Sequence, residues 1–493
     1  MSASAADRRP HVVVVGGGIA GLAAAARLIG VTTGDAGAST AAARPRVTVL
    51  ESSGRLGGKL RTGEVGGTTV DLGAESMLAR RPEAVALARA AGLGDELEPP
   101  TTAKAAIWTR GALRPMPTGH VMGVPGDLDT LAASGVISAA GLDRAAEDLE
   151  LPRTEVGEDV AIGAYVAARV GREIVDRLVE PLLGGVYAGN ADRISMRAAV
   201  PQLLPVARRE RSLIEGVRGI QARAPRSDAP VFQGVRGGIG RLPVAVAEAC
   251  RAAGVEIRTG AEVRGLRRTA SGWSVAVADV PGSSSERELA ADAVVLAVPA
   301  PAAARLLAAE SPAAAAELDA VEYASMALVT LAFRRSELGS VPAGSGFLVP
   351  PVDGRAIKAA TFSSNKWGWV AESAPDAFVL RTSFGRHGEE AVLQREDAEL
   401  VAAALADLRE AAGLTATPAA STVTRWQGGL PQYPVGHLDR VARVRALAAK
   451  LPGLALCGAA YDGVGIPACV GSGERAAQGV LDALTGTEAR MDS

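Results

Sequence analysis

Aromatic side chains make up only 3% of the 493 residues, and cysteine and histidine are scarcer still. The three cysteines, Cys250, Cys457 and Cys469, form no C-x-x-C pair, and none of the four histidines belongs to an H-x-H or H-x-x-x-H pair. These absences argue against a disulfide framework and against a zinc site. We therefore expect no metal, and three free thiols that pack as small apolar side chains in a reducing cytosol.

The chain also lacks an excess of charge of either sign. Its net charge is −2, which gives no basic field for nucleic acid, so we expect no nucleic-acid partner. A membrane span over residues 12–30 is disfavoured by three consecutive glycines and Arg27, and the polar leader 1–11 does not look like a secretory signal. With 48% apolar residues, the chain can bury a large core, and we expect more than one domain or one domain with large insertions.

A glycine-rich turn near the start organises the chain. The β-branched run 12–15 leads into a G-x-G-x-x-G turn and the apolar run 22–28, which predicts strand, tight turn and helix. Gly18 leaves room for a pyrophosphate at the positive end of the helix, and Gly21 lets helix and strand pack closely. A second strand over 47–51 ends at Glu51, which can accept both ribose hydroxyls. We therefore predict a dinucleotide site, with residues 31–46 as a surface loop.

A second glycine motif follows this strand, in the string E-S-S-G-R-L-G-G-K-L-R-T over 51–62, and a short strand over 69–72 then leads into 73–76. The combination of E-x-x-x-R-x-G-G-K-x-R-T with the first turn resembles the flavin amine oxidase and protoporphyrinogen oxidase superfamily. This resemblance implies FAD as the cofactor, rather than NAD. It also implies that the paired glycines pass close to the flavin, and that a basic side chain reaches phosphate or ribityl oxygens.

Two later strings resemble the bacterial porphyrinogen oxidases more specifically. They are E-P-L-L-G-G-V-Y-A-G over 180–189 and W-Q-G-G-L-P-Q-Y-P-V-G-H over 426–437. The resemblance is to the branch found in Gram-positive bacteria, and it implies that Trp426 lies beside the isoalloxazine and that the backbone of Val263 lies against the adenine.

The last unit reads as a strand over 453–457, a turn, and a helix over about 468–484. The N–H groups at the start of that helix suit the N1 and O2 edge of a reduced flavin. The wider flavoprotein class often has an acid directly after the glycine of this strand. Here Ala459 follows Gly458, and Asp462 is the acid nearby.

Taken together, these patterns predict an α/β fold with a Rossmann-like, three-layer FAD-binding domain, a mixed-sheet substrate-binding domain and an α-helical insertion. We assign 11–62, 231–300 and 440–486 to the first, 63–118 and 301–439 to the second, 119–230 to the insertion, and 1–10 and 487–493 to flexible termini. We also expect a helix over 82–97, strands over 273–278 and 293–298 that complete one small sheet, and a hairpin tip over 281–286.

The candidate site is a cofactor site, and no catalytic acid or base is nominated. Its expected members are Gly16, Gly17, Gly18, Ile19, Ala20, Gly21, Glu51, Ser52, Arg55, Gly58, Lys59, Gly73, Ala74, Glu75, Ser76, Val263, Trp426, Gly458, Val464, Gly465 and Ile466.

The function that the resemblance implies is oxidation of coproporphyrinogen III to coproporphyrin III in haem biosynthesis, by repeated hydride transfer to flavin N5. Dioxygen would reoxidise the flavin and yield H2O2. The alternatives are a protoporphyrinogen IX oxidase, an amine oxidase or carotenoid desaturase, for which the scarce aromatics offer little material for a cage, and a flavin-binding carrier without turnover.

The arginine-rich segment 207–226 is expected to be a solvated helix or loop. Its alternatives are contact with an anionic membrane surface, with a partner enzyme such as a ferrochelatase, or with substrate carboxylates. We expect a cytoplasmic protein, with peripheral membrane attachment as the alternative.

Overall fold

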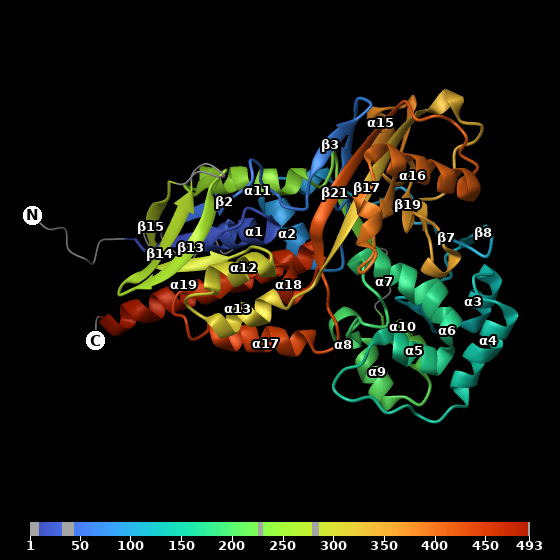
Figure 1. The fold of residues 1–493 in the computed structure, drawn as a ribbon, viewed down its shortest axis with the longest axis horizontal. Helices are drawn as coiled ribbons and strands as arrows, with labels where there is room; N and C mark the ends of the chain where they lie inside the picture. Colours follow the sequence, from blue (N-terminus) through green and yellow to red (C-terminus); the bar gives the residue numbers. More distant parts are fainter. Residues whose placement is uncertain (1–8, 32–43, 225–229, 279–284, 492–493) are drawn as a thin grey trace, which may run out of the picture.

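The computed structural model describes residues 9–31, 44–224, 230–278 and 285–491. The expected flexible leader, the surface loop over 31–46 and the hairpin tip over 281–286 lie mostly outside these residues. Three regions are visible in Figure 1: a sheet-and-helix region that contains α1 and α19, a second sheet at the upper right, and a group of helices at the lower right.

A five-stranded parallel sheet forms the centre of the first region. Its strand order is β12-β2-β1-β16-β22. Alternate residues of β1 point to opposite faces, so Val12 and Val14 belong to one buried cluster and Val13 and Val15 to another. The bounds are β1 (His11–Val15), β2 (Arg46–Glu51), β12 (Glu256–Thr259), β16 (Ala293–Leu296) and β22 (Leu454–Leu456).

Helices cover one face of this sheet, and a small antiparallel sheet with further helices covers the other. The first face carries α1 (Ile19–Leu28), α2 (Pro82–Ala90), α11 (Arg241–Ala252) and α19 (Ile466–Met491). The second carries β13 (Glu262–Thr269), β14 (Gly272–Ala278), β15 (Arg287–Ala291), α12 (Ala300–Leu307), α13 (Pro312–Asp319) and α17 (His437–Ala448). The predicted three-layer, Rossmann-like arrangement is therefore confirmed.

The prediction that 273–278 and 293–298 complete one small sheet is wrong. Strand β14 pairs with β13 and β15, whereas β16 lies between β1 and β22 in the parallel sheet. All four residues of β16 are apolar and buried, as is typical of a central parallel strand that is covered on both faces.

Two helices also differ from their expected bounds. Helix α2 ends at Ala90 rather than at 97, because Gly92 adopts a left-handed conformation with φ of +83°. Helix α19 begins at Ile466 and continues to Met491, past the expected end near 484. Helices α2, α12 and α13 lie within segments assigned above to the substrate-binding domain, yet they pack on the parallel sheet.

The second region is a seven-stranded mixed sheet in the order β21-β17-β20-β19-β18-β7-β8, in which only β18 and β7 pair in parallel. The strands are β7 (Ala105–Thr109), β8 (Ala112–Pro115), β17 (Tyr323–Arg334), β18 (Gly346–Leu348), β19 (Ala359–Thr361), β20 (Ala377–Phe384) and β21 (Ala420–Pro431). Helix α16 (Asp397–Ala412) covers one face. The other face carries β3 (Thr62–Val65), β4 (Thr68–Asp71), α14 (Ser363–Lys366) and α15 (Gly368–Ser373).

The third region, over 120–223, is mainly helical, as the sequence predicts. It contains β9 (His120–Val121), β10 (Val124–Pro125), α3 (Leu128–Ser134), α4 (Ala139–Ala146), η4 (Glu147–Leu149), α5 (Ile162–Val170), α6 (Arg172–Ile174), the π-helix η5 (Val175–Val179), α7 (Glu180–Tyr187), α8 (Met196–Ala199), α9 (Leu203–Arg209) and α10 (Leu213–Arg223). A buried ion pair between Arg169 and Asp148, with 2.5 Å between Nε and Oδ1, lies inside it.

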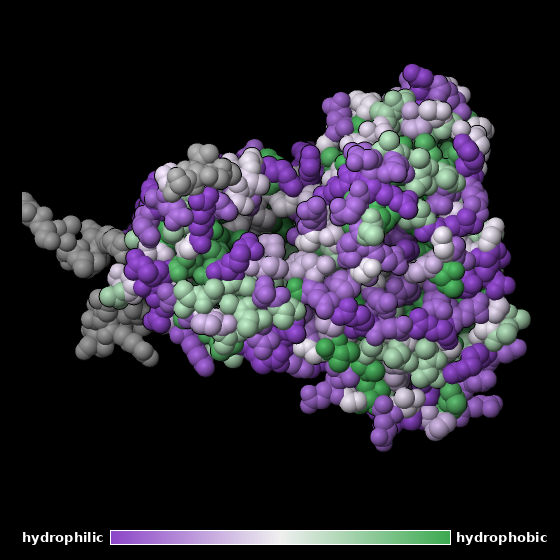
Figure 2. All heavy atoms as spheres, viewed as in Figure 1, coloured by the Kyte–Doolittle hydropathy of each residue, from purple (hydrophilic) through white to green (hydrophobic). Residues whose placement is uncertain are grey.

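The remaining short elements are β5 (Met77–Leu78), η3 (Gly94–Glu96), β6 (Leu97–Glu98), β11 (Phe232–Val235), η6 (Arg335–Glu337), η7 (Pro351–Asp353), η8 (Glu390–Gln394) and α18 (Ala459–Asp462). On the face drawn in Figure 2, polar side chains cover all three regions, and apolar groups gather mainly near β13–α12 and around α8–α9. Among the described residues, no helix combines the length and apolar character needed to cross a bilayer.

Candidate cofactor site

The first glycine turn leaves open space beside Gly18, where α1 begins. A Cβ added to Gly18 would meet no protein atom within 4 Å, and no side chain caps α1. By contrast, a Cβ on Gly21 would lie 2.0 Å from the carbonyl oxygen of Gly16, which explains the glycine there by close packing alone. Gly18 therefore has no steric partner within the protein. Open space at an uncapped helix N-terminus fits the phosphates of a dinucleotide.

The two glycine motifs lie against each other. The N–H of Gly57 donates to the carbonyl of Gly17 over 2.9 Å, and Gly18 and Gly57 form a parallel bridge. Gly58 has φ of +57°, and a Cβ there would lie 3.4 Å from the Cα of Gly18. The structure thus brings the two predicted motifs together around one open space.

Glu51 ends β2 at the edge of this space. Its carboxylate accepts from the N–H of Gly17 at 2.7 Å and from that of Ser53 at 2.8 Å, which fixes the side chain while leaving further lone pairs free. The N–H of Ala261 donates to the Glu51 carbonyl over 2.9 Å, so the start of β13, with Val263, follows directly beside the end of β2. Ser52 is exposed.

Lys59 is a cation without a counter-charge. Its side chain is exposed, and its ammonium has no hydrogen-bond or ion-pair partner among the residues that the structure describes. Desolvation by surrounding protein nevertheless lowers its pKa, while the Cys469 thiol in the first turn of α19 acts in the opposite direction. Lys59 therefore lies near the start of α19 with no partner for its charge among the described residues, which suits an anionic ligand.

Trp426 lies near the second motif, which contains Arg55. The indole N–H of Trp426 donates to the Leu72 carbonyl over 2.9 Å, and the Arg55 guanidinium lies 5.8 Å from the ring centroid. Arg55 also donates to the Gly58 carbonyl over 2.6 Å. A Cβ on Gly73 would lie 2.1 Å from the Lys59 carbonyl oxygen, so Gly73–Ser76 runs directly beside the second motif. These expected members therefore occupy neighbouring positions.

Glu75 does not present a free carboxylate. It is buried and forms ion pairs with Lys366, and with Arg381 over 3.0 Å. Arg381 also donates to the Gly73 carbonyl over 2.7 Å. Burial raises the pKa of Glu75, but Arg381 and Lys366 more than offset this, so its pKa is lowered. Glu75 therefore holds the 73–76 turn on strand β20 and helix α14.

Replacing Glu75 with Gln should destabilise the protein by about 3–5 kcal/mol at pH 7, because two largely buried cations lose their counter-charge. A carboxyl group with a lowered folded-state pKa contributes stability above its unfolded pKa of about 4.3, and this contribution is lost as pH falls through the folded value. The difference in Tm between wild type and E75Q should therefore be large at pH 7 and shrink below pH 4.3. An equal difference at both pH values would contradict this role.

The segment from Gly458 to Ile466 contains the last predicted members of the site. Gly458 has φ of +125° and no atom within 4 Å of an added Cβ, and Val464 packs against the core of the helical insertion. Asp462 is engaged: its carboxylate accepts from Ser472 at 2.5 Å and pairs with Arg445 at 2.7 Å and Arg475 at 2.9 Å. The carboxylate of Asp462, the acid near the expected ribityl position, is therefore already paired with side chains of α17 and α19.

Two aromatic residues outside the predicted site, Tyr433 and His437, connect the 426–437 string to the segment that follows Gly458. The rings of Tyr433 and His437 stack at 4.2 Å, and the Tyr433 hydroxyl donates to the Ala459 carbonyl. Burial lowers the pKa of His437 to about 4, so it is neutral at pH 7, and its Nε2 contacts the Ala460 carbonyl at 3.0 Å. Both residues belong to the 426–437 string, so the resemblance in that string was the sequence signal that could have identified them.

Comparisons with known proteins agree with this geometry. The sequence model named "Flavin containing amine oxidoreductase" matches residues 19–481. Coproporphyrinogen III oxidase of Mycobacterium tuberculosis H37Rv is 39% identical over 479 residues, covering 97% of this chain and 98% of that protein. The Bacillus subtilis enzyme of the same name is 32% identical over 487 residues, covering 97% and 99%.

A solved structure is similar over nearly the whole chain as well. A crystal structure from Exiguobacterium sp. 255-15, which carries the provisional name protoporphyrinogen oxidase, superposes with a TM-score of 0.82 at 33% identity and covers 97% of this chain and 99% of that one. The fold, both glycine motifs and these full-length similarities lead to one assignment. The chain belongs to the flavin containing amine oxidoreductase family, and its cofactor is FAD.

Proposed function

We propose that this protein is an FAD-dependent, oxygen-using oxidase that converts coproporphyrinogen III to coproporphyrin III. The observation that carries the proposal is the full-length similarity to two enzymes of that name, at 39% and 32% identity. The joined glycine motifs and the open space beside Gly18 support it by fitting the cofactor. The alternative within the family is protoporphyrinogen IX as the substrate, which the provisional name of the Exiguobacterium protein favours.

We further propose how the chain holds FAD. The N–H groups at Gly18–Gly21 and the backbone at Gly58 would hold the pyrophosphate, Glu51 with neighbouring Ser52 the ribose, and the Val263 backbone the adenine. Around the flavin we place Arg55, Lys59, the Gly73–Ser76 turn, Trp426, Gly458 and the Val464–Ile466 start of α19. When bound, FAD supplies a two-electron acceptor that dioxygen can regenerate.

The residues of the chain would then act by placement and electrostatics. Lys59 and the first turn of α19 would supply positive charge and N–H groups to the proposed cofactor site, where they favour negative charge on a bound ligand. Six hydrogen atoms leave the macrocycle in three two-electron steps, and each step would reduce one dioxygen to H2O2. No side chain has to act as a nucleophile.

The purified protein should be yellow, with FAD bound non-covalently. All three cysteines are buried, and burial raises the pKa of Cys250 to about 12 and that of Cys469 to about 11, so neither offers a thiolate for attachment. Acid precipitation should leave the flavin in the supernatant and a colourless pellet. Flavin that stays with the polypeptide would contradict this.

Aerobic incubation with coproporphyrinogen III tests the function itself. We expect the absorption spectrum of coproporphyrin to appear together with about three equivalents of H2O2, as full aromatisation requires. A flavin-loaded protein that forms neither product would instead be a carrier. H2O2 formation from amines but not from porphyrinogens would indicate an amine oxidase.

We also propose a cytoplasmic protein that associates transiently with an anionic membrane surface or a partner such as a ferrochelatase. The arginine-rich segment supports this, because Arg209 and Arg211 are exposed and their side chains have no partner among the described residues. Co-sedimentation with anionic vesicles, or with purified ferrochelatase, should weaken as salt rises and when both arginines become Gln. No association at low salt would leave the segment a solvated helix.

A further inference from the structure

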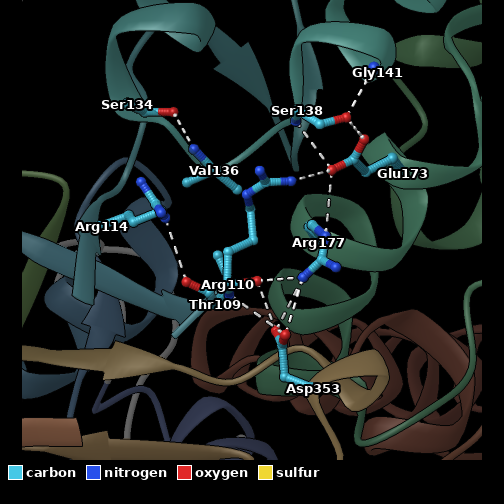
Figure 3. A network of polar contacts seen from close by, with 10 residues as sticks. All are labelled: Thr109, Arg110, Arg114, Ser134, Val136, Ser138, Gly141, Glu173, Arg177 and Asp353. Atoms are coloured by element: carbon cyan, nitrogen blue, oxygen red, sulfur yellow. Dashed lines mark hydrogen bonds and ion pairs between the residues drawn. The ribbon is translucent and has the colours of Figure 1, made fainter. Parts of the chain in front are cut away.

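An ion-pair network joins the helical insertion to the seven-stranded sheet (Figure 3), near β7 and α6, which lie apart from α1 in Figure 1. The Arg177 guanidinium lies 3.0 Å and 3.2 Å from the two carboxylate oxygens of Asp353. Thr109, the last residue of β7, donates to Asp353 over 2.6 Å and lies 2.5 Å from Arg177. One helix of the insertion is thus held to β7 and to the 351–353 turn.

Glu173, one turn earlier on the same helix, extends the network. Its carboxylate pairs with Arg177 Nε at 3.4 Å and with Arg110 of the β7–β8 turn at 3.3 Å, and accepts from the Ser138 N–H at 3.0 Å. Arg177 and Asp353 are each 18% exposed, so the pair is partly shielded from solvent. We call Arg177, Asp353, Thr109, Arg110 and Glu173 the clamp.

The helix that carries the clamp is continuous from Arg172 to Tyr187, but its turn over Val175–Val179 is a π-helix. Pro181 accounts for this irregularity, because proline has no N–H and in a regular α-helix its ring clashes with the carbonyl four residues earlier, here that of Arg177. Single π turns occur frequently at functional sites. The wide turn carries Arg177, so the local distortion and the clamp coincide.

The other end of this helix lies beside the cofactor site. Gln432 donates from its side chain to the Tyr187 carbonyl over 2.8 Å, and the rings of Tyr187 and Tyr433 lie 5.6 Å apart. Gly185 and Val186 are exposed, and an added Cβ on Gly185 would lie 3.8 Å from Leu348 of the sheet. At 1.5 Å per residue, the clamp lies about 13 Å along the helix from this exposed surface.

The junction between helix and sheet has an apolar part and a polar part: Ile107 of β7 belongs to the same buried cluster as Leu178 and Leu183 of the helix, whereas the part near Asp176 and Glu180 is polar. A cavity of about 130 Å³ separates Asp176 and Glu180 of the helix from Val352 and Arg386 of the sheet side. In the polar part, discrete attachments add to these apolar contacts in fixing the helix position. Near the cofactor these are backbone hydrogen bonds, such as His387 N–H to the Ala188 carbonyl at 2.7 Å, and at the far end they are the side chains of the clamp.

We propose that Arg177 and Asp353 are positioning residues for porphyrinogen oxidation: their ion pair sets the distance between the 172–187 helix and the sheet, and thereby the space beside Gly185 and Val186 that receives the macrocycle. This inference rests on the proposed function. Neither residue contacts the macrocycle. They act by holding the 172–187 helix, which contacts the macrocycle at Gly185 and Val186. Their loss therefore lets this helix move about its attachments near the cofactor.

Asp353→Asn tests the proposal, since it keeps size and an acceptor for Thr109 but removes the charge that Arg177 needs. We expect KM for coproporphyrinogen III to rise on the order of tenfold, with kcat and FAD content close to wild type. Exchanging the charges, Arg177→Asp with Asp353→Arg, should recover part of the loss. Asp192→Asn is the matched control. Asp192 pairs over 2.8 Å with Arg172, the first residue of the helix that carries Arg177, but this ion pair lies within the helical insertion and does not reach the sheet.

An unchanged KM in D353N, or an equal rise in D192N, would overturn the proposal. If D353N loses FAD or fails to fold, Thr109→Val decides, because it removes one hydroxyl from the clamp and should raise KM more modestly. If wild type oxidises no porphyrinogen, the proposed function fails, and fluorescence titration with coproporphyrin III then tests the clamp separately: D353N should bind it more weakly than D192N does. Equal binding would overturn the clamp.

Discussion

Replacing Gly18 with valine should give a folded protein that contains no FAD. The backbone at Gly18 has φ of −72° and ψ of 174°, a conformation that valine adopts readily, and no protein atom lies within 4 Å of an added Cβ. The polypeptide alone therefore tolerates the side chain. The proposed pyrophosphate does not, and we expect FAD affinity to fall on the order of a hundredfold or more. Flavin absorbance and thermal unfolding of the purified variant measure both parts.

Two other glycines serve as controls for this variant. Gly54 also has open space around an added Cβ, but it is not among the residues predicted to bind the cofactor. The Gly54→Val variant should therefore keep its flavin. Gly16 has φ of +110°, and its Cβ would lie 2.6 Å from the Ala297 carbonyl, so Gly16→Val should lower Tm by distorting the turn itself. Full flavin content in G18V would refute the placement of the pyrophosphate, whatever the controls do.

The cofactor region was predictable because its information is local. A strand, a glycine turn and a helix follow one another within residues 11–28, and each choice of residue has a steric reason that the sequence displays. The contact between Gly57 and Gly17 could be expected only from the family resemblance, since nothing in either motif alone specifies that they meet.

Contacts between residues far apart in the sequence were not predictable. The resemblance places Glu75 in the cofactor site, which stays a prediction, but its ion pairs were not predictable, because Lys366 and Arg381 lie about three hundred residues later and no local pattern connects them. Strand β16 was placed in the wrong sheet for a similar reason, because its apolar residues predict burial without naming the neighbouring strand. The clamp residue Asp353 follows the same rule, since only the fold brings it to Arg177.

The two porphyrinogens that the family comparison leaves open differ in charge. Coproporphyrinogen III carries four propionates, and protoporphyrinogen IX has vinyl groups in place of two of them. A site that pairs four carboxylates leaves donors unpaired when two become vinyls, and an unpaired buried donor costs about 1–3 kcal/mol. Shape alone discriminates far less, because the macrocycle is common to both.

We therefore expect kcat/KM to be about tenfold or more higher for coproporphyrinogen III than for protoporphyrinogen IX. The similarity to the Mycobacterium and Bacillus enzymes named for the former supports this direction. Initial rates of porphyrin formation in detergent-free buffer, repeated at one low detergent concentration for both substrates, separate preference from solubility. If the preference in kcat/KM for coproporphyrinogen III becomes smaller as the salt concentration rises, charge is the cause of the preference. A clear preference for protoporphyrinogen IX would overturn the substrate assignment and leave the family membership intact, because that membership rests on the family match over residues 19–481 and not on the substrate.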